Sequence, residues 1–127
     1  MSRYAAGLLC IAGGLAAAPA LAHHSFAVFD QTKVLYASGT VKELEWINPH
    51  AWLHVVINDA AGKPANWAFE GGATAQLTQL GWKPDSLKPG DKVEVGYRPM
   101  KDGSRGGQIM NVTLPNGQKV CSNRGCG

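Results

Sequence analysis

The sequence predicts a mainly all-β protein: a small five-stranded barrel with one short helix between the third and fourth strands. Several short segments alternate apolar with polar residues, which is the pattern of half-buried strands. Gly, Pro and Asn residues that favour turns separate these segments. The 105 residues that follow residue 22 suit one small domain. Closing five short strands into a barrel also removes their unpaired edges.

The first 22 residues have the layout of a secretory signal peptide. Arg3 supplies an early positive charge, an apolar run covers residues 5–18, and small residues at Ala20 and Ala22 precede the expected cleavage point. The apolar run is shorter than the ~20 residues that a membrane-spanning helix needs. We therefore expect a mature chain that begins at His23, a periplasmic or secreted location, and no stable membrane insertion once the signal peptide is removed.

The expected strands follow from the alternation and from the turn residues between them. In the second strand, for example, Leu53, Val55 and Ile57 fall on one face. Gly39, within the first strand, is expected to form a bulge or a bend. The predicted strands cover residues 34–46, 51–58, 65–70, 92–97 and 108–114.

The helix is expected over residues 73–80, where good helix formers follow a glycine pair and Gly81 provides a stop. Asn116-Gly117 predicts a tight turn that leads the chain back through residues 119–120. This order of elements is that of an oligonucleotide/oligosaccharide-binding (OB) barrel. Three residues of the last strand are expected to point inward: Met110, Val112 and Leu114.

The last seven residues, 121–127, are expected to form a flexible tail beyond a single barrel domain at residues 23–120. This tail contains Cys121 and Cys126. In an oxidising compartment the two cysteines can close a small disulfide loop, and otherwise they remain mobile thiols. Two cysteines without a second cysteine pair are a poor zinc signature.

Distinctive short motifs are spread over residues 22–120. They include Ala22-His23-His24-Ser25-Phe26, Asn48-Pro49-His50-Ala51-Trp52, Glu70-Gly71-Gly72, Leu80-Gly81-Trp82 and Leu87-Lys88-Pro89-Gly90-Asp91. With these motifs the chain resembles a family of small, uncharacterised secreted proteins that is common in Gram-negative bacteria. The resemblance implies a periplasmic, barrel-like domain of unknown function. It supplies no activity, and it does not extend past Val120.

Composition and motifs argue against several functional classes. After residue 22, eleven Lys and Arg face nine Asp and Glu, a net charge of +2, and the basic residues are scattered. We therefore expect no nucleic-acid partner. The sequence has no Gly-x-Ser-x-Gly elbow and no phosphate-binding loop. We expect a monomeric, non-enzymatic protein that requires no cofactor, and a metal-dependent redox activity is the remaining enzymatic alternative.

Two tryptophans flank the turn that carries His50, and an acidic residue ends the following strand. An exposed aromatic side chain next to a His and a Glu is typical of ligand surfaces on small barrels. We therefore predict a binding or accessory module whose ligand or protein partner is unknown and whose ligand face lies near the mature amino terminus. The predicted ligand-binding residues are Trp46, His50, Trp52 and Glu70. In the alternative, Trp52 joins Phe26 and Phe29 in a small hydrophobic cluster beneath the amino-terminal arm.

All four histidines lie between residues 23 and 54. As the first residue of a processed chain, His23 offers an amine and an imidazole together, a chelate that copper(II) favours. His50 adds a third nitrogen if the amino terminus crosses the barrel mouth. The alternative function is therefore copper binding or handling, with candidate ligands His23, His24, His50 and His54. The competing interpretation is that these histidines are solvated or structural.

Overall fold

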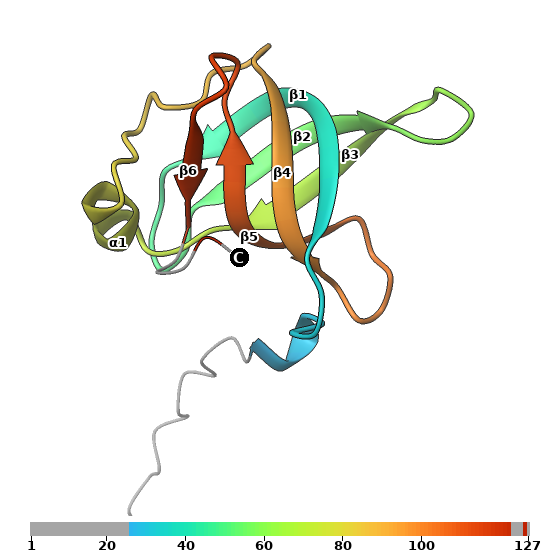
Figure 1. Ribbon diagram of the computed structural model, residues 1–127, viewed down its shortest axis with the longest axis horizontal. Coiled ribbons are helices and arrows are strands. Elements are labelled where there is room, and N and C mark those ends of the chain that lie inside the picture. The colour runs from blue at the N-terminus through green and yellow to red at the C-terminus, as the bar shows by residue number, and fades with distance from the viewer. Residues whose placement is uncertain (1–25, 123–125, 127) are drawn as a thin grey trace, which may run out of the picture.

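The computed structural model describes residues 26–122 and 126, so the predicted signal peptide lies outside it. This part of the chain contains a short 3₁₀ helix, six strands and one α-helix (Figure 1). Their bounds are η1 Phe26–Val28, β1 Leu35–Glu45, β2 Trp52–Asn58, β3 Pro64–Glu70, α1 Thr74–Gln79, β4 Lys92–Pro99, β5 Gly106–Thr113 and β6 Lys119–Cys121. The five predicted strands and the helix begin and end within two residues of these bounds. Among the described residues, no helix has the length and apolar character needed to cross a bilayer.

The strands close into a ring. β1 pairs with β2 and with β4, β2 continues to β3, and β4 continues to β5, all antiparallel. A parallel pairing of β3 with β5 completes the ring (Figure 1). This confirms the predicted five-stranded barrel with one short helix between its third and fourth strands. One edge of β5 is shared, because its residues 106–108 pair with β3 and its residues 111–113 pair with β6.

Two glycines allow β5 to approach its neighbours closely enough for closure. A Cβ atom on Gly106 would lie 2.1 Å from the carbonyl oxygen of Ala68, and one on Gly107 would lie 2.2 Å from that of Arg98. Gly106 also has a φ of 154°, which L side chains rarely adopt. Closure therefore requires glycine here, and closure is what brings the ends of β3, β4 and β5 together.

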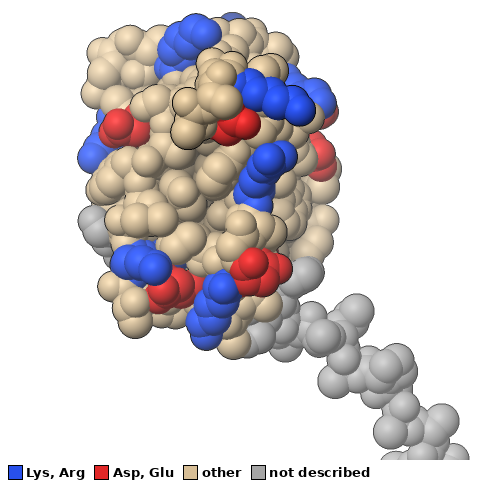
Figure 2. Space-filling model, turned by 90° about the vertical axis from the view of Figure 1, so that its right-hand side faces the viewer, with Lys and Arg blue, Asp and Glu red and all other residues tan. Residues whose placement is uncertain are grey.

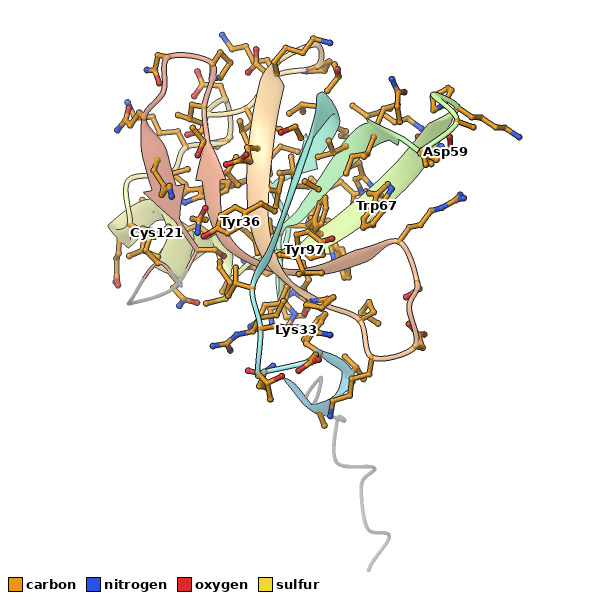
Figure 3. All side chains as sticks on the ribbon, turned by 45° about the vertical axis from the view of Figure 1, so that its right-hand side comes forward. Lys33, Tyr36, Asp59, Trp67, Tyr97 and Cys121 are labelled. Carbon is orange, nitrogen blue, oxygen red and sulfur yellow. A yellow bond between two sulfur atoms is a disulfide. The ribbon has the colours of Figure 1, made fainter. Side chains whose placement is uncertain are left out.

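The barrel encloses an apolar core in which Phe69 and Tyr97 are buried and against which the partly buried Trp67 packs. Phe69 lies 5.1 Å from Tyr97 and 6.0 Å from Trp67, between ring centroids. Trp67 and Tyr97, both labelled in Figure 3, lie edge-on with their ring centroids 6.0 Å apart. Burial raises the pKa of Tyr97. Other buried side chains of the core are Leu53, Val55, Leu77, Trp82, Leu87, Val95 and Val112.

The prediction that Met110 points into the core is wrong. The register between β4 and β5 shifts at this point, so that Tyr97 lies opposite Ile109 and Gly96 lies opposite Asn111. Met110 is the extra residue between these two pairs. Ile109 therefore takes the inward position and joins the core cluster, whereas Met110 is buried outside that cluster.

The irregularity expected at Gly39 in β1 lies further along the strand. The register with β2 shifts between Val41 and Glu43, which makes Lys42 the bulged residue. Gly39 instead pairs regularly with β4. A Cβ atom on Gly39 would lie 2.4 Å from the carbonyl oxygen of Val56, so this glycine permits β1 to cross β2 at short range.

The segment before β1, residues 26–34, docks beside the end of β4, and we call it the arm. Phe29 is buried and forms an isolated antiparallel bridge with Met100. The backbone N–H of Asp30 donates to the carbonyl oxygen of Pro99 at 2.8 Å. These contacts bring the chain that leaves the predicted signal peptide to one end of the barrel.

At the other terminus, a disulfide joins Cys121 to Cys126, which decides between the two alternatives for these cysteines. Cys121 ends β6 and lies near α1 (Figure 3). The Asn111 side-chain amide donates to the carbonyl oxygen of Cys126 at 2.9 Å, and the Ser122 N–H donates to that of Met110 at 3.0 Å. Ser122 and Cys126 are therefore both hydrogen-bonded to β5.

Candidate functional site

A cleft of about 460 Å³ lies where the arm, the β1–β2 loop and the start of α1 meet the ends of β3, β4 and β5. Volumes in this range are typical of small-molecule sites. Small or apolar residues form part of the cleft wall, and several polar side chains also line it. Those side chains are Gln31, His50, Glu70, Gln76, Arg98, Gln108 and Ser122.

Hydrogen bonds between loops fix the position of His50 in this cleft. The Asn48 side-chain oxygen accepts from the Thr74 backbone N–H at 3.1 Å and from the Thr74 hydroxyl at 3.0 Å. It thereby satisfies a backbone donor in the first turn of α1. The Ala51 N–H donates to the carbonyl oxygen of Gly72 at 3.0 Å. The β1–β2 loop is thus tied on both sides of His50 to the segment that follows β3.

His50 and Glu70 form the most enclosed polar contact of the cleft. The Nδ1 atom of His50 lies 2.5 Å from Oε1 of Glu70, whose side chain is only 10% exposed. His50 is 32% exposed and forms the outer member of the pair. A buried carboxylate is costly unless a donor satisfies it, and here His50 supplies that donor.

Arg98 and Gln108 form the opposite wall of the cleft. The Nη1 atom of Arg98 donates to the side-chain oxygen of Gln31, on the arm. In the described structure, Nε of Arg98 and Oε1 of Gln108 are buried and have no hydrogen-bond partner. Most buried polar groups in native proteins are satisfied, so such atoms call for an explanation. Two such atoms on neighbouring strands of one cleft indicate a site in which a polar ligand supplies the missing hydrogen bonds.

The structure divides the predicted ligand face. His50 and Glu70 come together in the cleft. Trp46 is half-buried and packs against the core, and Trp52 lies half-buried opposite Glu70 in the β2–β3 register. Neither tryptophan lines the cleft. Phe29, expected in the alternative cluster with Trp52, is buried where the arm meets the loop after β4.

The candidate metal ligands are also separated. His54 lies outside the cleft, where its Nε2 atom is 2.7 Å from Oε1 of Glu45 on the neighbouring strand. His23 and His24 lie outside the described residues. Within residues 26–122 and 126, no group of three or more His, Cys, Asp and Glu side chains is placed to hold a metal ion. The described residues therefore bring none of the other candidate metal ligands to His50.

Sequence reasoning missed the wall that Arg98 and Gln108 form. The predicted fourth strand ends at residue 97, one residue before Arg98, which places this arginine in a loop. The observed register puts Gln108 opposite both Glu70 and Arg98, so the three side chains form a row across β3, β5 and β4. The signal was the OB strand order itself, because a parallel pairing of the third and fifth strands brings this row together.

One comparison with known proteins identifies the chain's family. A family model described as a family of unknown function, DUF6152, matches residues 12–111. No curated protein and no solved structure matches the chain significantly. The match includes the arm and most of the barrel, whereas β6 and the disulfide lie beyond it. It agrees with the expectation of an uncharacterised family. The chain belongs to DUF6152, a family of unknown function.

Proposed function

We propose that this protein is an exported, periplasmic, non-enzymatic binding module that holds a small polar ligand in the cleft beside the arm. The observation that carries the proposal is the pairing of the buried His50–Glu70 contact with the unsatisfied atoms of Arg98 and Gln108 in one cleft. A site that is preorganised by strands and short loops loses little entropy when a ligand binds.

Surface charge and sequence motifs support binding of a small molecule over other functions. On the face shown in Figure 2, basic and acidic side chains are interspersed and do not gather by sign. Nucleic-acid binding usually requires a clustered basic surface. The sequence also carries no recognised catalytic motif, so the cleft's polar groups are best interpreted as ligand contacts.

The test is a binding screen of small polar compounds against the processed protein, followed by amide NMR. We expect hits to shift amide resonances of Gly71, Gly72 and Gln108, and to lose affinity in E70Q and R98Q. Matched controls are E43Q and R105Q, which remove the same charges from exposed positions outside the cleft. Mass spectrometry should recover each bound compound unchanged. Chemical conversion of a hit would contradict the non-enzymatic part of the proposal.

A second candidate function is copper binding, and the position of the arm favours it. Ala27 lines the same cleft as His50 and stands four residues after His23. Four residues of chain reach at most ~14 Å, so the amine and imidazole of a processed His23 lie within reach of the cleft. The proposed ligand set is His23 with His50. His24 is a further candidate ligand, whereas His54 pairs with Glu45 outside the cleft and is left out of this set.

Copper(II) titration of four forms tests this candidate. The mature protein beginning at His23 should bind more tightly than a form with one extra amino-terminal Ala. H50A should weaken binding, and H54A serves as the matched histidine control. Equal affinity in all forms would contradict the copper site.

A further inference from the structure

The cleft contains two opposite charges that do not neutralise each other. Glu70 lies opposite Gln108 on β5, and Gln108 lies opposite Arg98 on β4. Adjacent strands are ~4.8 Å apart, so the backbones of Glu70 and Arg98 are separated by ~10 Å. In the described structure Glu70 pairs with His50 and Arg98 with Gln31, and no ion pair joins the two charges.

Each charge is fixed in its place by its own neighbour. Glu70 is held by His50, which belongs to the tied β1–β2 loop. The Arg98 guanidinium is held through Nη1 by Gln31 of the arm. Because separate elements orient the two groups, the cleft presents a negative end and a positive end at a set spacing. Such a field favours a molecule whose own charges have the opposite arrangement.

Two buried polar atoms along this row also lack hydrogen-bond partners in the described structure. Gln108 stands in the middle of the row, and its Oε1 atom is a buried acceptor without a donor. Nε of Arg98 is a buried donor without an acceptor. A ligand that completes this row therefore supplies an acceptor at the Arg98 end and donors toward Gln108 and Glu70.

We infer that the ligand of this cleft is a dipolar molecule, with a carboxylate directed to Arg98 and an ammonium directed to Glu70. This inference rests on the proposed function and specifies its ligand class. The ~10 Å between the two strand positions favours charges separated by several bonds over the close pair of an α-amino acid. Carboxylate–guanidinium contacts are charge-assisted and strong, which makes Arg98 the specificity-determining end.

A set of straight-chain probes tests the inference directly. Isothermal titration calorimetry and amide NMR would compare the affinity and binding site of 6-aminohexanoate with those of glycine, hexanoate and hexylamine. We expect 6-aminohexanoate to bind at least about tenfold more tightly than each singly charged probe. The reason is that one hydrogen bond to a charged group changes a binding constant by about this factor. Glycine should bind more weakly than 6-aminohexanoate.

Two variants assign each end of the probe. In R98Q, 6-aminohexanoate should bind no better than hexylamine, and in E70Q no better than hexanoate. R105Q and E43Q should retain the preference of the unmodified protein. The dispersion of the amide spectrum reports whether each variant is folded. If E70Q does not fold, R98Q alone decides, because Arg98 is on the outer side of the barrel and only partly buried.

The outcomes separate this inference from the proposed function. If singly charged probes shift the cleft resonances as strongly as 6-aminohexanoate, the cleft binds small molecules but the dipolar ligand class is wrong. If 6-aminohexanoate keeps its preference in R98Q, the assignment of the carboxylate to Arg98 is wrong. If neither these probes nor any compound in the wider screen perturbs the cleft, the proposed function and this inference fail together.

Discussion

Two His–Glu pairs among the described residues are close in the sequence and alike in geometry, yet their surroundings differ. His50 and Glu70 are 2.5 Å apart, and His54 and Glu45 are 2.7 Å apart. The Glu70 side chain is 10% exposed and shares a cleft with Arg98, whereas Glu45 is 35% exposed on the outer surface of two paired strands. Enclosure and neighbours, more than the contact distance, distinguish a candidate site from a surface pair.

A second hollow of the molecule supports the same conclusion. It is larger than the cleft, about 770 Å³ against about 460 Å³, and lies between the β1–β4 pair and the end of β5. Its cation, Lys92, is exposed and donates to the Thr40 hydroxyl at 2.6 Å. Volume alone therefore does not indicate a ligand site. The smaller cleft is the better candidate because its polar groups are enclosed and incompletely satisfied.

The largest expected effect comes from opening the barrel at Gly106. In G106A the new methyl group would overlap the Ala68 carbonyl oxygen in a backbone conformation that disfavours alanine, so we expect a loss of about 3 kcal/mol or more. Urea unfolding measures this loss. Amide shifts should change around Glu70 and Gln108 more than around His54. The matched control is G103A, in an open loop with positive φ, for which we expect about 1 kcal/mol.

Removing the disulfide is expected to have the next largest effect. A loop as short as that between Cys121 and Cys126 contributes about 2 kcal/mol to the free energy of unfolding. Because Ser122 lines the cleft, C121S/C126S should also weaken ligand binding and leave the amides around His54 unchanged. Calorimetry of the double variant measures both effects. Unaltered stability and affinity would show that the segment after β6 has no part in the cleft.

The two histidines themselves give a smaller, direct contrast. H50A leaves the enclosed Glu70 carboxylate without its donor, which should cost about 1–2 kcal/mol in urea unfolding. H54A breaks an exposed pair, for which we expect less than about 1 kcal/mol. Equal losses would mean that enclosure does not separate the two pairs.

The smallest expected effect concerns the arm at low pH. The Asp30 carboxylate accepts hydrogen bonds from the Thr32 hydroxyl and N–H, which lower its pKa to about 2. Because the pKa is lowered, the turn stabilises the folded protein at pH values above 3.8, the ordinary pKa of the carboxyl group. That stabilisation is lost as the pH falls toward 2. NMR titration of the Asp30 carboxyl should show the low midpoint, and T32V should raise it.

The fold could be predicted further than the site. The order of the strands and the helix in the barrel could be predicted from two signals. These were the alternation of apolar and polar residues, as in residues 51–58, and the turn residues between the strands. The bulge at Met110 was not predictable, because apolar residues at both 109 and 110 fit either register. His50 and Glu70 were found because they flank turns. Arg98 and Gln108 were missed because their proximity to Glu70 depends on closure of the barrel. Closure pairs Glu70 with Gln108, 38 residues later in the sequence, and nothing in the local pattern reveals that pairing.

An amide shift map of the mature protein titrated with 6-aminohexanoate tests most directly whether the cleft is the ligand site. We predict saturable changes at Gly71, Gly72, Arg98 and Gln108, with little change around His54 or Lys92. Changes centred on His54 or Lys92, with the amide resonances of the cleft unchanged, would contradict the assignment of the cleft as the ligand site.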